Sequence, residues 1–213
     1  MRYRPISPAA LATELTERVA ALPDRRLAIA VDGADGATDT AQLADALVDP
    51  LRLLGRAAVR VPASGFLRPA SLRFEHGKRN PDARYTDWLD HGGLRREVLN
   101  PLAAGGSGAV LPALWDADRD RATRLARVPV PDRGVVLVNG EFLLGAGLAF
   151  DLVVHLWLSP AALRRRLPAD EAWAMPAYER YETEVDPGLL ADVVVRVDDP
   201  RHPAVYEPEE PEA

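Results

Sequence analysis

The stretch LAIAVDGADGATDTAQLA, residues 27–44, decides the fold. Its apolar beginning, residues 27–31, predicts a buried strand, and a helix is expected to begin near Thr40. The loop between them contains Gly33 and Gly36. A strand, a glycine-containing loop and a helix form the setting in which backbone N–H groups bind a phosphate. The sequence therefore predicts a loop of the phosphate-binding type at this point.

The loop departs from the usual pattern G-x-x-x-x-G-K-[ST] at two positions. Thr38 stands where the second glycine is expected, and its side chain resists the left-handed backbone that glycine adopts readily. Asp39 stands where lysine is expected, so attraction to phosphate becomes repulsion. Unit charges ~4 Å apart interact by about 4 kcal/mol at an effective dielectric near 20. The candidate nucleotide-binding residues are Gly33, Ala34, Asp35, Gly36, Ala37, Thr38, Asp39 and Thr40.

Two questions about the replacement of the loop lysine by Asp39 stay open. Lys78 is the only lysine of the chain, so it alone could replace the missing loop lysine, and it comes from a distant segment. Carboxylates near a helix N-terminus are favoured by the helix dipole. Asp39 could therefore serve as an internal substitute for the phosphate charge.

The bulk composition excludes several classes of protein. With 213 residues, 47% of them hydrophobic, we expect one domain over residues 1–206 and a disordered acidic tail at 207–213. The net charge of −6 argues against nucleic acid and anionic membranes as partners. Cysteine is absent, and the four histidines are too scattered to suggest a metal site. We find no signal segment and no apolar run near the ~18 residues of a membrane span, so we expect a cytoplasmic protein.

Strands and helices are expected to alternate along the chain. The expected strands are residues 27–31, 57–61, 134–138, 151–158 and 191–197. The expected helices are residues 8–22, 40–54, 92–99, one from Pro160, and 170–185 with a break at Pro176. This alternation predicts an α/β fold with a five-stranded parallel sheet and helices on both faces. The carboxyl ends of such strands converge on one site.

The long polar segment of residues 62–90 is expected to be an ordered, substrate-facing loop, because long loops are usually functional or disordered and this one carries aromatic residues. Asp90 is expected to cap the following helix. Residues 109–115 are expected to form a small hairpin strand. His155 alternates with apolar neighbours on a strand, which favours a core histidine over a catalytic one.

The order of these pieces over residues 27–205 resembles the uridine kinase and phosphoribulokinase family, and most closely its short actinobacterial members. The segments that carry the resemblance are Asp32-Gly33-Ala34-Asp35-Gly36, Phe66-Leu67-Arg68-Pro69, Tyr85-Thr86-Asp87-Trp88-Leu89-Asp90, Asn100-Pro101-Leu102, Trp115-Asp116, Val138-Asn139-Gly140-Glu141, Tyr178-Glu179-Arg180-Tyr181 and Ala191-Asp192-Val193. The resemblance implies the three-layer fold of P-loop NTPases, with a lid over residues 160–185.

The resemblance also implies a reaction, the transfer of a phosphoryl group from ATP to the 5′-hydroxyl of uridine or cytidine, with Mg²⁺ as cofactor. Thr40 would then be the Mg²⁺ ligand, and Arg164, Arg165 and Arg166 would be lid arginines. The implied substrate-binding residues are Phe66, Arg68, Tyr85, Asp87, Trp115 and Asp116.

The residues that such a reaction requires are replaced. The catalytic carboxylate of the family aligns with Ser64-Gly65, and Asn139 occupies the acidic position at the strand end. Ser64 and Glu141 are the catalytic candidates that are left. Together with the lost lysine, these changes predict weak or absent kinase activity.

Three functions stay open at this stage. The chain could still be a nucleoside or small-metabolite kinase that uses Arg68, Lys78 or the lid arginines for charge, with His76 and Lys78 as replacement catalysts. It could be a pseudokinase, with neither ATP nor Mg²⁺, that binds a nucleoside or acts through a protein partner or a second copy. The same cleft could also support another chemistry with Glu141, Asp87 or Asp90.

Overall fold

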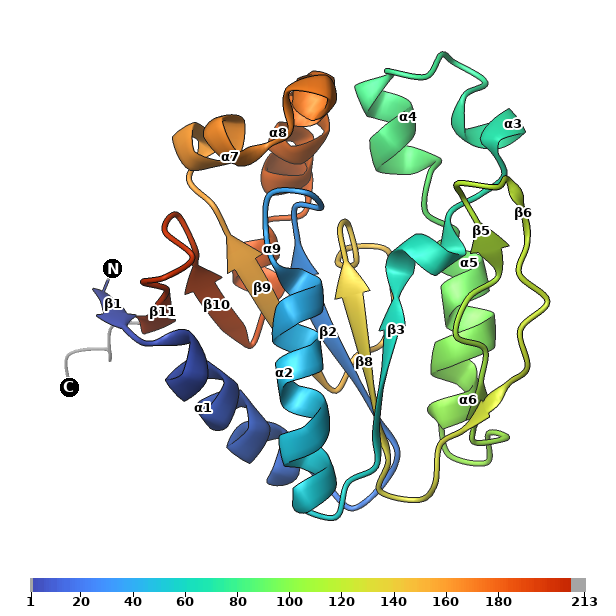
Figure 1. Cartoon of the computed structure of the whole chain (residues 1–213), viewed down its shortest axis with the longest axis vertical. Coiled ribbons are helices and arrows are strands. Elements are labelled where there is room, and N and C mark those ends of the chain that lie inside the picture. Colours follow the sequence, from blue (N-terminus) through green and yellow to red (C-terminus); the bar gives the residue numbers. More distant parts are fainter. Residues whose placement is uncertain (1, 208–213) are drawn as a thin grey trace.

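A seven-stranded sheet forms the centre of the protein (Figure 1). The computed structural model describes residues 2–207. Five neighbouring strands are parallel, as predicted, and the α/β class is confirmed. In sheet order they are β10 (Val193–Arg196), β9 (Leu152–Trp157), β2 (Leu27–Gly33), β8 (Val135–Gly140) and β3 (Ala58–Pro62).

Strand β2 lies between β8 and β9, and all seven of its residues are buried. Helices cover both faces of the sheet, so the strand has no side that favours polar residues. This explains why residues 27–31 form a continuous apolar run. The same position places the loop after Gly33 at the middle of the carboxyl edge of the sheet.

Two edge strands were not predicted. Strand β11 (Ala204–Glu207) pairs antiparallel with β10, and β1 (Arg2–Pro5) pairs antiparallel with β11. Both have only four residues, and β1 ends at a proline, which is tolerated at a sheet edge. Their pairing joins segments about 200 positions apart, which no local pattern reveals. Apart from Glu207, which ends β11, the tail expected to be disordered lies outside the described residues.

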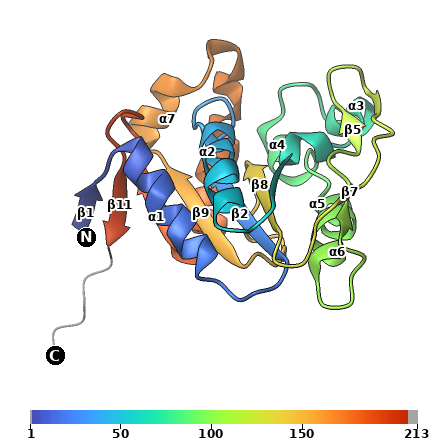
Figure 2. The ribbon, with the colours of Figure 1, turned by 60° about the horizontal axis from the view of Figure 1, so that its bottom comes forward.

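Helices α1 (Pro8–Ala20) and α2 (Thr40–Leu53) lie side by side on one face, and α2 packs on β2, β8 and β3 (Figure 2). Ser7 caps α1: its hydroxyl accepts a hydrogen bond from the backbone N–H of Ala10. Buried Arg56 donates to the carbonyls at the end of α1 and so joins the ends of the two helices. The short helix α9 (Pro187–Leu190) contacts β9 on the opposite face.

The segment between β3 and β8 is ordered, as expected, and is built from short helices. They are η1 (Ala63–Phe66), α3 (Ala70–Arg73), α4 (Pro81–Thr86), α5 (His91–Leu94), the π-helical turn η2 (Arg95–Leu99) and α6 (Asn100–Leu102). Asp90 caps α5, as predicted. The expected hairpin strand is instead divided between two small ladders, β4 (Ala109–Val110) with β7 (Val128–Pro129) and β5 (Trp115–Asp116) with β6 (Arg121–Ala122).

The connection from β9 to β10 consists of α7 (Pro160–Arg166), the 3-10 helix η3 (Ala169–Ala174), α8 (Met175–Glu184) and α9. Helices α7 and α8 of this connection form the upper left part of the molecule in Figure 1. Pro176 lies at the beginning of α8, where its missing N–H costs nothing, and this explains the predicted break. Within residues 2–207, no helix is long and apolar enough to cross a membrane.

Candidate functional site

The loop between β2 and α2 is closed on itself. The backbone N–H groups of Ala37 and Thr38 and the Thr38 hydroxyl all donate to the carbonyl of Ala34, at 3.2, 2.9 and 2.9 Å. Gly36 has a left-handed backbone, with φ of +72°. A phosphate-binding loop needs its N–H groups directed at the anion. Here the N–H groups of Ala37 and Thr38 serve the loop itself.

The side chain of Thr38 is buried inside this loop. A Cβ placed on Gly33 would lie 2.6 Å from its Oγ1, so only glycine at position 33 leaves room for the threonine. The Thr38 side chain therefore packs within the loop, against Gly33 and the carbonyl of Ala34.

Glu141, just beyond the end of β8, brings a carboxylate to the mouth of the loop. Its Oε2 accepts hydrogen bonds from the backbone N–H of Asp35 at 3.4 Å and from the Tyr178 hydroxyl at 2.5 Å. Its Oε1 accepts from Arg84 Nε at 3.1 Å. This carboxylate thus meets a loop N–H group and an arginine, which are the partners that a phosphate would seek.

Arg84 is held in a buried aromatic setting. Its guanidinium also pairs with Glu171, and it lies over the rings of Trp88 and Trp173 at 5.3 and 5.4 Å from their centroids. Burial lowers the pKa of Arg84, but the charges of Glu141 and Glu171 outweigh that effect and raise it. The pKa of the Glu141 carboxyl is raised because burial disfavours its charged form, and the charge of Arg84 offsets only part of this rise. The charge of the arginine is therefore used within the protein.

Asp39, at the position of the missing lysine, is 59% exposed and caps no helix N–H. Its carboxylate lies 3.7 Å from Arg166, which also donates to the carbonyl of Val197 at 2.7 Å. Lys78 is placed over the ring of Phe74, with its ammonium 5.9 Å from the centroid. Arg164 of α7 pairs with Glu179 of α8, and both side chains are exposed.

The residues at the expected Mg²⁺ position bind one another. Arg60 Nη1 donates to Asn139 Oδ1 at 3.1 Å, which directs the amide nitrogen of Asn139 toward Thr40 Oγ1 at 3.3 Å. An N–H donor facing the threonine oxygen takes the place of a cation. Within residues 2–207, no cluster of three or more His, Asp or Glu side chains could hold a metal ion. The amide nitrogen that faces Thr40 Oγ1 and the carboxylate of Asp39 at the lysine position disfavour Mg²⁺ and a triphosphate at this loop.

The two catalytic candidates meet in one cavity. Ser64 and Glu141 both line a space of about 90 Å³, together with Asp35, Arg84 and Trp88. Pockets that hold small ligands usually begin near 300 Å³. This space, where the resemblance would put the acceptor, is too small for a nucleoside.

The structure spreads the expected substrate-binding residues over several places. Phe66 is fully buried in the core, so it supports the loop and does not face a substrate. Tyr85 packs on Phe142 at 5.5 Å between ring centroids. Trp115 and Asp116 bind Asp120 and Arg119 within the β5–β6 ladder. Arg68 and Asp87 do not line the small cavity, although their sequence neighbours Leu67 and Trp88 do.

Sequence reasoning missed Arg84 and the role of the two tyrosines of α8. Tyr178 binds Glu141, and Tyr181 donates to the buried carboxylate of Asp32 at 3.1 Å. Residues three apart lie on one face of a helix, so the spacing of the two tyrosines is the signal that could have found them. Arg84 carries no such signal, because its partners come from distant segments.

Comparison with known proteins places this geometry in a structural class. No family model and no curated protein matches the chain. It is similar to the solved structure of a protein described as a possible uridine kinase from Bacillus stearothermophilus, with a TM-score of 0.69, 19% identity, and 86% of this chain and 96% of that one covered. It is also similar to a protein described as a fructose transport system kinase from Silicibacter, with a TM-score of 0.60, 24% identity, and 86% and 91% covered.

The chain therefore has the fold of the P-loop kinases. The three-layer fold that the resemblance implied is confirmed, with two antiparallel strands added at one edge. Within that class its shape is similar to the uridine-kinase-like structure over most of both chains. The loop that gives the fold its name is present in position and altered in chemistry.

Proposed function

We propose that this protein is a pseudokinase that keeps the P-loop kinase fold without transferring phosphoryl groups from ATP. The observation that carries the proposal is the hydrogen bond from the backbone N–H of Asp35 to Glu141. A carboxylate of the protein sits at the mouth of the loop, and its charge is balanced by Arg84.

Electrostatics support the same conclusion. A bound triphosphate would meet the carboxylates of Asp39 and Glu141, and the buried Thr38 side chain would compete with it for space. Repulsion between like charges ~4 Å apart costs about 4 kcal/mol per pair at an effective dielectric near 20. No lysine lies in the loop to offset this cost.

The ligand class that suits the proposal is a small metabolite. The acidic net charge of the chain disfavours nucleic acid, and the small cavity beside Ser64 disfavours a nucleoside in the acceptor position. A protein partner or a second copy of the chain is the alternative way for a pseudokinase to act. We further propose a cytoplasmic location, where such metabolites are found.

The proposal is tested by calorimetric titration of the full chain with MgATP and MgGTP, and by a phosphotransfer assay with uridine and cytidine. We expect no heat of binding and no phosphorylated product. MgATP-dependent phosphorylation of either nucleoside that is lost in the Thr40→Ala variant would overturn the proposal, because it would show a working nucleotide site.

A further inference from the structure

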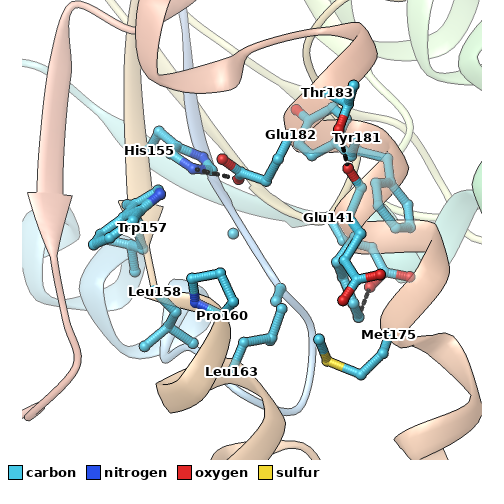
Figure 3. A pocket seen from close by; sticks show the side chains of 16 residues that line it. Glu141, His155, Trp157, Leu158, Pro160, Leu163, Met175, Tyr181, Glu182 and Thr183 are labelled. Atoms are coloured by element: carbon cyan, nitrogen blue, oxygen red, sulfur yellow. Dashed lines mark hydrogen bonds and ion pairs between the residues drawn. The ribbon is translucent and has the colours of Figure 1, made fainter.

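A second cavity, of about 290 Å³, lies between the carboxyl end of β9 and the helices α7 and α8 (Figure 3). It shares Glu141 and Phe142 with the small cavity beside Ser64, and of the β2–α2 loop it is lined only by Gly33 and Ala34. Its wall is mostly apolar, formed by Leu156, Trp157, Leu158, Pro160, Leu163 and Met175. The volume is close to the lower limit for small-molecule pockets.

One wall of this cavity carries a fixed imidazole. His155 on β9 is buried, and its Nδ1 lies 2.7 Å from Asp32 Oδ2. Asp32 also accepts from the Tyr181 hydroxyl and, at its Oδ1, from the backbone N–H of Leu143 at 2.9 Å. Because the carboxylate only accepts, Nδ1 must donate to it. The other ring nitrogen, Nε2, is left to face the cavity.

This Nε2 has no hydrogen-bond partner among residues 2–207, although it is buried. Oε1 of Glu182 lies 3.7 Å away, beyond hydrogen-bond distance, and Figure 3 shows the two side chains next to each other at one side of the cavity. Burial lowers the pKa of His155, but Asp32 and Glu182 outweigh it and raise the pKa to about 9.

His155 Nε2 and Glu182 Oε1 together favour one kind of ligand group. An oxygen about 2.8 Å from both His155 Nε2 and Glu182 Oε1 would accept one hydrogen bond and donate another. A hydroxyl group does both, whereas an ammonium only donates and a carboxylate only accepts. A carboxylate ligand would also be repelled by Glu141, Glu179 and Glu182, which all line the cavity.

We propose that this cavity binds a small, uncharged alcohol or phenol whose hydroxyl bridges His155 and Glu182 and whose apolar body packs against Trp157 and Leu163. The inference rests on the proposed function only in treating the chain as a binding protein. It makes no use of the phosphate loop, so a failure of one proposal leaves the other standing.

The test compares probes that differ in one group. Benzyl alcohol, toluene, benzylamine and benzoate are titrated into the full chain, with His155 followed through the nitrogen resonances of its labelled imidazole. We expect benzyl alcohol to bind about tenfold more tightly than each of the others, as one charge-assisted hydrogen bond predicts. We also expect the Nε2 resonance to move on binding. The proposal would be overturned if toluene bound as tightly as benzyl alcohol, or if none of the probes bound.

Variants locate the site. Glu182→Ala removes the acceptor and should weaken benzyl alcohol binding about tenfold. Glu184→Ala is the matched control, because the two glutamates are 45% and 48% exposed on the same helix and Glu184 pairs with Arg180 outside the cavity. Leu163→Trp should fill the cavity and abolish binding. An unchanged affinity in Glu182→Ala would also contradict the proposal. MgATP titration of the same samples reports separately on the pseudokinase proposal.

Discussion

The backbone N–H of Asp35 donates a hydrogen bond to the carboxylate of Glu141, 106 positions further along the chain. This contact joins the beginning of the altered phosphate loop to the end of β8. It gives the loop an internal anion in place of an external one. This arrangement has consequences that can be measured.

Repairing the loop requires three changes. We expect a Thr38→Gly, Asp39→Lys, Glu141→Gln triple variant to gain MgATP binding, because it empties the loop, restores the cation and removes the competing carboxylate. A ligand at 100 times its dissociation constant stabilises a protein by about 2.7 kcal/mol, which a thermal shift detects. Asp39→Lys alone should bind no MgATP. If it binds as well as the triple variant, Thr38 and Glu141 do not block the site.

Arg84→Met should destabilise the protein by about 3–5 kcal/mol, since it leaves Glu141 and Glu171 without their buried partner. Arg164→Met is the control, because Arg164 is 63% exposed and its pair with Glu179 is worth less than about 1 kcal/mol. Urea unfolding at pH 7 measures both. Adding Glu141→Gln to Arg84→Met should recover part of the lost stability. If the double variant loses the sum of the two single losses in the free energy of unfolding, Arg84 and Glu141 are not coupled.

Asp32→Ala should also cost about 3–5 kcal/mol, because His155 Nδ1, the Tyr181 hydroxyl and the N–H of Leu143 lose a shared acceptor. Asp45→Ala, which removes an exposed pair with Arg60, should cost about 1 kcal/mol or less. Urea unfolding measures both losses, from the shift in the denaturant midpoint and one shared dependence of the free energy of unfolding on urea concentration. Equal losses in the two variants would show that the buried cluster contributes nothing special.

Stability should fall as the pH rises from about 6.5 to about 9. The pKa of His155 is raised from 6.5 to about 9 in the folded protein, so its protonation stabilises the fold fully below the lower value. That stabilisation, about 3 kcal/mol, is lost as the pH passes the higher value. His155→Gln should flatten the profile in this range, and His202→Gln, at an exposed site, should leave it unchanged. A flat profile in the unaltered protein would contradict the assignment.

Local pattern was enough for much of the architecture. The apolar run before Gly33 and the helical spacing after Thr40 predicted β2 and α2, because a strand buried on both faces and an amphipathic helix each leave a period in the sequence. Asp39 at the lysine position predicted a loop that disfavours phosphate. The resemblance in the order of pieces supplied the P-loop kinase fold.

The partners of that loop could not be read from the sequence. Glu141 was a weak catalytic candidate, and its contact with Asp35 and Arg84 depends on strands that are neighbours only in the folded sheet. His155 was expected to be a core residue; it is buried, but its Nε2 has no hydrogen-bond partner among the described residues and lies 3.7 Å from Glu182. Side-chain chemistry shows which residues could interact, whereas their distances are set by tertiary packing.

The sequence by itself determined the α/β class, the central strand, the loop and the loss of its cation, because each depends on residues within one short segment. Only the tertiary structure decided that Glu141 and Arg84 meet at the mouth of the β2–α2 loop, that β1 and β11 extend the sheet, and that Asp32, His155 and Glu182 meet beside a cavity. The physical reason is that these contacts join segments up to about 200 positions apart, and no local periodicity encodes where two distant segments will pack.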